Sequence, residues 1–194
     1  MKKLLVAIFI SLGFVACKNE PTLQKYYVEN QNNENFSIID VPRSLVINDY
    51  TKLSAEDRKV MESIDKAVVL LLPLNGENKT MYEKEKNKVE KILQNDDYHL
   101  LMQMGSGRSG VKVSYLGDAD AIDEVVVFGK DDEKGFALAR ILGDDMNVSA
   151  ILGMMKSIGE KEIDFDESGI EAIFKSFDKG PATIRDSIVI DTIN

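Results

Sequence analysis

The sequence has very few of the side chains that build metal centres and disulfide frameworks. Its 194 residues include one cysteine and one histidine. A single cysteine cannot form an internal disulfide, and one histidine with one cysteine does not supply the usual ligand set of a zinc site. Disulfide-stabilised folds and multi-histidine metal centres are therefore excluded, and no cofactor is expected.

Positive charge is also scarce. There are 24 Lys and Arg against 33 Asp and Glu, which gives a formal net charge of −9. A nucleic-acid-binding surface needs clustered Lys and Arg to neutralise phosphates, so no nucleic-acid partner is expected. Hydrophobic residues make up 44% of the chain and charged residues 29%, a composition typical of a folded globular protein.

The first 17 residues have the order of a secretory signal. Lys2 and Lys3 precede an apolar run of 13 residues, 4–16, and the chain turns polar after Cys17. The run is too short to span a bilayer, which takes about 20 residues, but it suits the apolar region of a signal peptide. Residues 1–16 are therefore expected to be removed from the mature protein.

The residues before Cys17 resemble the lipobox of bacterial lipoproteins. The triplet is Phe14-Val15-Ala16, with Phe14 in place of the usual leucine. The resemblance implies that Cys17 receives lipid and holds the protein at the membrane. Lys18 after the cysteine resembles lipoproteins released to the outer membrane of the bacterial cell envelope. The alternatives are an ordinary secreted protein with an accidental cysteine, or a short core helix.

Downstream of the signal, the pattern predicts three regions: a polar tether over 17–35, one domain over 36–178 and a tail over 179–194. No internal repeat is visible. We expect a single α+β domain with a mixed, mostly antiparallel sheet of about five strands and three to four helices. The expected strands are 36–41, 67–74, 111–115, 122–128 and 136–142. Helices are expected after capping boxes at Ser54–Asp57 and Thr80–Glu83, over 98–104, from Asn147 to Gly159 and, more weakly, near 170–177.

Four short blocks are similar to a known family. They are residues 97–102 (DYHLLM), 111–116 (VKVSYL), 122–129 (IDEVVVFG) and 142–146 (LGDDM). In these blocks the chain resembles domain of unknown function 4252 (DUF4252), a family of Gram-negative envelope proteins. The resemblance implies a secreted or lipid-anchored protein without an assigned activity, in an envelope-stress or signalling context.

The remaining motifs favour ordinary structural roles. Gly105–Gly110 resembles a phosphate loop, but a helix is expected before it and a strand after it, which is the wrong order for phosphate binding. Asp118, Asp120 and Asp144 lack the spacing of a calcium loop and form at most a weak ligand site. His99 has no recognisable nucleophile to assist and is expected to be a core or surface residue.

These observations predict a non-enzymatic, lipid-anchored envelope protein that binds an envelope partner protein or has a structural role. The sequence shows no recognisable set of nucleophile, base and oxyanion donors. The alternative is an envelope lipoprotein that binds a small ligand or Ca²⁺ through Asp118, Asp120 and Asp144. An enzyme that uses paired carboxylates ranks third.

Replacing Cys17 tests the lipid anchor. We expect Cys17→Ala to remain unprocessed by the lipoprotein peptidase or to release the domain in soluble form, because the thiol is the only point of lipid attachment. Metabolic labelling with a radioactive fatty acid, followed by membrane fractionation, measures both effects. A Cys17→Ala protein that keeps the acyl label and stays with the membrane would show that the anchor lies elsewhere.

Overall fold

The apolar run expected as a strand over 67–74 forms the C-terminal part of β2 (Ile64–Pro73). Leu70, Leu71 and Leu72 are fully buried. β2 lies between β1 (Ser37–Val41) and β6 (Gly135–Met146), and it pairs antiparallel with both. A strand that is apolar on both faces is stable only in such an interior position, so the prediction for this segment is confirmed.

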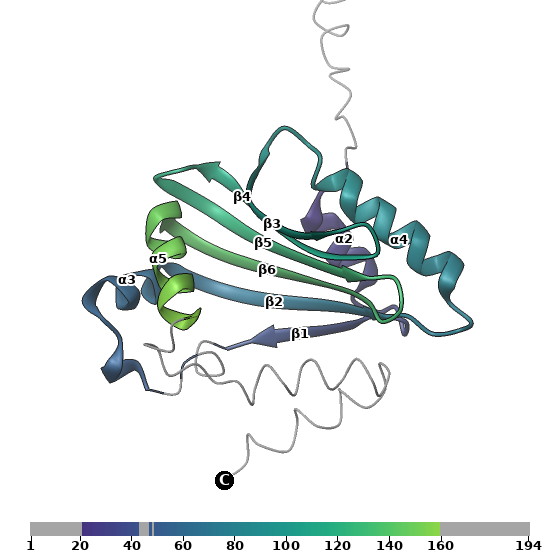
Figure 1. The fold of residues 1–194 in the computed structure, drawn as a ribbon, viewed down its shortest axis with the longest axis horizontal. Helices are drawn as coiled ribbons and strands as arrows, with labels where there is room; N and C mark the ends of the chain where they lie inside the picture. The colour runs from purple at the N-terminus through teal and green to yellow at the C-terminus, as the bar shows by residue number, and fades with distance from the viewer. Residues whose placement is uncertain (1–20, 43–46, 48, 160–194) are drawn as a thin grey trace, which may run out of the picture.

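The computed structural model describes residues 21–42, 47 and 49–159. In this part of the chain one antiparallel sheet has the strand order β1-β2-β6-β5-β4-β3 (Figure 1). The other strands are β3 (Tyr98–Ser106), β4 (Ser109–Asp118) and β5 (Ala121–Asp131). The helices are α2 (Leu23–Asn30), α3 (Ala55–Ser63), α4 (Lys79–Ile92) and α5 (Val148–Gly159), with a 3₁₀ turn, η2, at Tyr50–Lys52. The α+β class is confirmed, with one strand more than expected.

Two helix starts follow the predicted capping. The Ser54 hydroxyl accepts a hydrogen bond from the Asp57 backbone N–H at 3.0 Å, and the side-chain amide oxygen of Asn147 accepts one from the Ala150 N–H at 3.1 Å. The capping box at Thr80–Glu83 is wrong, because α4 already begins at Lys79. Asn78 precedes the helix, and its side chain bonds back to the loop and to the Pro73 carbonyl.

Helix α2 lies inside the range expected to be a polar tether. Leu23, Tyr26 and Tyr27 are buried on one face of this helix, and the Tyr27 hydroxyl donates to the Leu138 carbonyl at 2.5 Å. These three residues have helical spacing, but the segment around them is polar on average. The prediction of a tether followed that average and missed the helix. Residues 23–30 therefore belong to the domain. Cys17, residues 170–177 and the tail 179–194 lie outside the described residues.

The helix expected over 98–104 is wrong, because this segment forms strand β3. Tyr98, Leu101 and Met102 fit a helical spacing, but in the structure β3 pairs along its length with β4. The register shifts between Leu100 and Met102, which interrupts the alternation typical of a strand. The segment over 105–110 is a tight hairpin rather than a flexible connection, and Gly107 at its tip has a φ of +67°.

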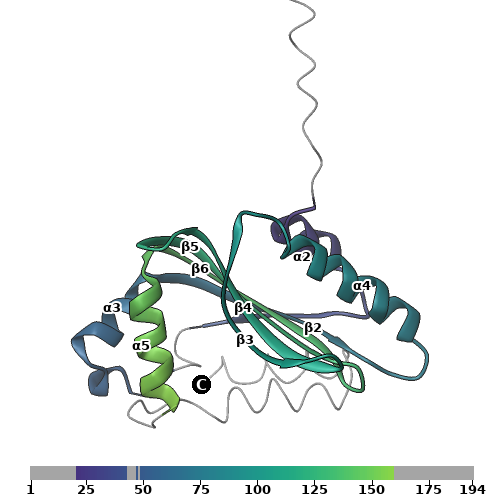
Figure 2. The ribbon, with the colours of Figure 1, turned by 45° about the horizontal axis from the view of Figure 1, so that its top comes forward.

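The helices cover opposite faces of the sheet at opposite ends (Figures 1 and 2). Helices α2 and α4 pack on one face around a cluster that includes Leu70, Tyr82, Phe128 and Phe136. Helices α3 and α5 pack against each other at the other end, and α5 contributes to the cluster around Ile122 on the second face. The β3–β4 hairpin forms the edge of the sheet beside α4. Its tip contacts the turn between β5 and β6, where the Asp132 N–H donates to the Arg108 carbonyl at 2.9 Å.

The interior position of β2 can be measured. We expect Leu70→Ala to lower the free energy of unfolding by about 2–5 kcal/mol, because it leaves a cavity at a fully buried site. Urea denaturation followed by circular dichroism measures this change. Leu152→Ala is the matched control, since Leu152 is 41% exposed on α5. An equal loss in the two variants would contradict the interior placement of β2.

Candidate functional site

A groove runs between helix α4 and the β3–β4 hairpin. It consists of two cavities of about 120 and 170 Å³, which share Glu90, Gln103, Lys112 and Phe128 as lining residues. We call it the α4–hairpin groove. It lies at the position where α4 stops covering the sheet, and it combines an aromatic floor with charged and amide side chains.

The floor of the groove follows from the two-residue period of the strands. Lys112 on β4 pairs in register with Phe128 on β5 and with Gln103 on β3, so all three side chains lie on the same face of the sheet. Helix α4 supplies the wall through Glu90 and Leu93. Alternation along three neighbouring strands therefore places amide, ammonium and aromatic groups side by side.

One ion pair joins the floor to the wall. The Lys130 ammonium lies 2.6 Å from a Glu90 carboxylate oxygen, and both side chains are largely buried. Lys112 is half-buried and has no hydrogen bond or ion pair with any residue in the described part of the chain. Because Glu90 is neutralised by Lys130, Lys112 leaves one uncompensated positive charge at the centre of the groove. An ammonium in such a place favours a bound carboxylate or other anionic group.

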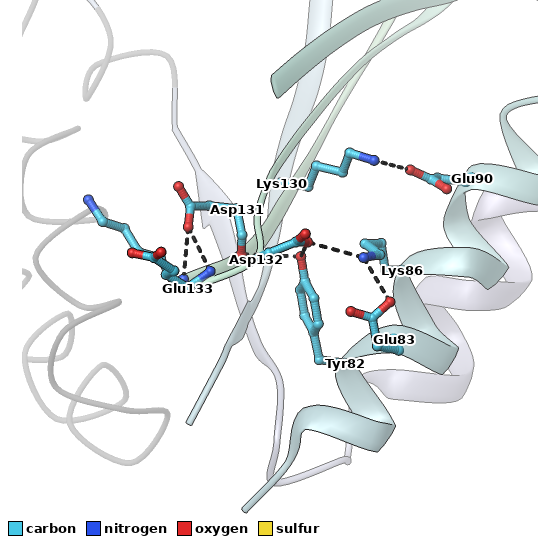
Figure 3. A network of polar contacts seen from close by, with 9 residues as sticks. Tyr82, Glu83, Lys86, Glu90, Lys130, Asp131, Asp132 and Glu133 are labelled. Atoms are coloured by element: carbon cyan, nitrogen blue, oxygen red, sulfur yellow. Dashed lines mark hydrogen bonds and ion pairs between the residues drawn. The ribbon is translucent and has the colours of Figure 1, made fainter. Parts of the chain in front are cut away.

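A second polar network holds α4 against the turn between β5 and β6 (Figure 3). The Asp132 carboxylate accepts hydrogen bonds from the Tyr82 hydroxyl and from the Lys86 ammonium, each at 3.1 Å. Lys86 also pairs with Glu83 at 2.8 Å. The hydrogen bond from Lys86 lowers the pKa of Asp132, whereas burial raises the pKa of Tyr82. This network fixes the position of α4 and with it the width of the groove.

A buried ion pair lies at one end of the groove. The Arg140 guanidinium is 2.7 Å from the Glu124 carboxylate, which is 2% exposed. The Tyr98 hydroxyl donates to the other oxygen of Glu124 at 3.4 Å, and Arg140 also bonds to Gln24 on α2. Burial raises the pKa of Tyr98. Burial lowers the pKa of Arg140, but the hydrogen bond to Glu124 and the neighbouring negative charge together outweigh it, so the pKa of Arg140 is raised. These groups fasten β3 and α2 to the centre of the sheet.

The sequence-predicted ligand residues lie away from this groove. Asp118 is at the end of β4, Asp120 is in the following turn and Asp144 is near the end of β6, and all three are exposed. Asp120 accepts a hydrogen bond from the Asn147 amide at 3.1 Å. Among the described residues, no group of three or more His, Cys, Asp or Glu side chains is arranged to hold a metal ion. Asp120 is a turn residue, and Asp118 and Asp144 are exposed positions at strand ends.

His99 lies on the edge strand and is exposed. Its ring packs against the ring of Tyr115 on β4, with 5.2 Å between the ring centroids. This contact is on the face of the sheet opposite the groove, because Leu100 and Gln103 take the groove face. The position agrees with the expectation of a surface histidine.

Sequence reasoning missed the residues that form the groove. In the sequence Lys112 is one polar position in an alternating strand, and Glu124 follows a run of acidic residues that starts at Asp118. The available signal was an ionisable residue on a face that is otherwise apolar, as with Glu124 among the residues of β5. The groove also depends on the pairing of β3 with β4. The sequence pattern predicts a helix over 98–104 and therefore hides this pairing.

A larger hollow lies on the other face of the sheet, near the ends of β1 and β2. Its volume is about 280 Å³, and Val41, Met61 and Ile64 contribute to a mostly apolar lining. Its charged groups are Asp65 and the ion pair of Lys66 with Asp40, whose charged atoms are 2.9 Å apart.

Together these features define a small α+β domain with an antiparallel six-stranded sheet and a polar groove beside its hairpin edge. The chain belongs to the family described as Domain of unknown function (DUF4252), whose model matches residues 26–177. The match begins within α2, in agreement with its place in the domain. No curated protein and no solved structure matches the chain. In the described part, no helix is long and apolar enough to cross a membrane.

The buried ion pair can be tested by replacing one partner or both. We expect Arg140→Met to lower the free energy of unfolding by about 3–5 kcal/mol, because it leaves the Glu124 charge buried and unpaired. The combination of Arg140→Met with Glu124→Leu should recover most of this loss, since no buried charge remains. Chemical denaturation measures both changes. A double variant that is no more stable than Arg140→Met alone would contradict a direct coupling between the two side chains.

Proposed function

We propose that this chain is a lipid-anchored protein of the bacterial cell envelope that binds a partner protein and does not catalyse a reaction. The resemblance of residues 1–17 to a lipoprotein signal supports the anchor at Cys17 and the outer membrane as the location. Family membership supports a location outside the cytoplasm, because the family resemblance implies secreted or lipid-anchored proteins.

The observation that carries the binding role is the uncompensated ammonium of Lys112 in the α4–hairpin groove. A half-buried charge without a partner is costly, and a ligand that neutralises it gains that energy on binding. The flanking Gln103 and Gln94 supply amide donors and acceptors, and Leu93 and Leu100 supply an apolar surface. We infer that the partner inserts a segment with an acidic side chain beside an apolar one.

The groove is rigid enough for this role. Glu90 is held by Lys130, and α4 is held by the network around Asp132 (Figure 3). A preformed site loses little conformational entropy when a segment binds, so a small contact area can be specific. The two cavities form an elongated channel along the strand, which suits an extended segment of protein.

Site-specific photocrosslinking in living cells tests the groove. A benzophenone amino acid at Gln103 is expected to give a discrete adduct with one envelope protein, and Lys112→Glu is expected to abolish it by repelling the acidic segment. Lys59→Glu is the matched control, because Lys59 is an exposed lysine on α3, outside the groove. In the Lys59→Glu variant, the probe at Gln103 should give the same adduct as in the wild type.

Two results would contradict the proposal. One is the absence of any adduct from the groove while probes elsewhere on the surface give them. The other is an adduct at Gln103 that persists undiminished in the Lys112→Glu variant. The expression level and the melting temperature of each variant show whether folding is intact.

A further inference from the structure

The two edges of the sheet differ in how they are protected. Strand β1, at one edge, has five residues, includes the exposed Asp40 and is followed by Pro42. Short length, a charged side chain and a nearby proline are the usual features that prevent an edge strand from pairing with another chain. The β1 edge is therefore blocked in the ordinary way.

Strand β3, at the other edge, has none of these three features. Its one irregularity is the bulge between Leu100 and Met102. It has nine residues, Tyr98–Ser106, and none of them is charged or proline. Each of the other five strands contains at least one charged residue. Two of the four large hydrophobic side chains that are exposed in the described part of the chain lie here, Leu100 at 59% and Met104 at 56%.

We propose that two copies of this chain pair through their β3 strands, antiparallel, and join their sheets into one. No strand in the described part of the chain pairs with the outer edge of β3, and an uncharged edge of this length is a template for strand addition. A second copy is the partner that fits, because a two-fold axis places each strand against itself. In a protein with a net charge of −9, β3 is the strand on which such self-pairing meets no like-charge repulsion.

The symmetry of this pairing agrees with the proposed lipid anchor, on which this step rests. Antiparallel pairing at a sheet edge is generated by a two-fold axis perpendicular to the sheet, so α2 and α4 of both copies lie on the same side. Helix α2 begins at Leu23 and packs on that side (Figure 2). Both chains therefore enter their domains from the same side, as two lipids in one membrane leaflet require.

The same axis brings the two α4–hairpin grooves together. Leu100 and Gln103 on β3 line the groove, so they lie at the seam between the two copies. A partner protein then meets two adjoining grooves with one Lys112 in each. Binding across the seam would gain from the raised effective concentration of the second site.

Sedimentation of the full, lipidated chain in non-ionic detergent tests the pairing. We expect the protein mass of a dimer for the wild type. Combining Leu100→Glu with Met104→Glu is expected to halve that mass, because charges of one sign then meet across the seam. The matched control combines Val28→Glu with Leu152→Glu, which are exposed on α2 and α5, and it should remain dimeric.

Cysteine crosslinking gives an independent measurement in intact envelopes. Cys17 is the chain's only cysteine, so a residue changed to cysteine along β3 provides the only free thiol once Cys17 is lipidated. Oxidation should link two copies at one or more positions between Tyr98 and Ser106, and Leu152→Cys should give no link. A monomeric wild type, a dimer that survives both glutamates, or no β3 crosslink would overturn the proposal.

These outcomes are separable from a failure of the proposed function. If the chain is not lipidated, or if the groove binds no partner, the mass in solution still reports the β3 pairing. A monomer that remains lipid-anchored and gives the Gln103 adduct would overturn the pairing alone.

Discussion

The packing of Phe136 under helix α4 is the contact on which the rest of the structure depends. Its ring lies 5.6 Å from that of Phe128, 6.1 Å from that of Tyr82 and 6.4 Å from that of Phe36, measured between centroids. It therefore connects β5, β6, α4 and the segment before β1 in one aromatic cluster. Gly135 precedes it with a φ of +120° and lies so close to the β2 backbone that a side chain would not fit.

The position of α4 follows from this cluster, and the groove follows from the position of α4. The apolar side of the helix is buried on the sheet, while Glu90 and Lys86 reach ionic partners on β5 and the turn after it. Partly buried pairs of this kind add specificity more than stability, because each charge pays for its desolvation. They determine where the helix ends relative to the hairpin, and this separation creates the groove.

The edge strand and the groove belong to one structural feature. The β3–β4 hairpin lines the groove, and its outer edge has no neighbour in the described part of the chain. Tyr98 and the ion pair of Arg140 with Glu124 fasten the base of this hairpin. The hairpin is thus held firmly at its base while its binding surfaces remain available.

Local sequence determined the elements whose signals come from neighbouring residues. The apolar run within β2, the hairpin of β5 and β6 and the caps at Ser54 and Asn147 were predictable, because period and capping are short-range properties. Tertiary structure alone decided the rest. β3 is a strand only because β4 pairs with it across a bulge, and α2 is a helix only because the sheet buries its three apolar residues. The groove at Lys112 depends on these long-range contacts, which no local pattern encodes.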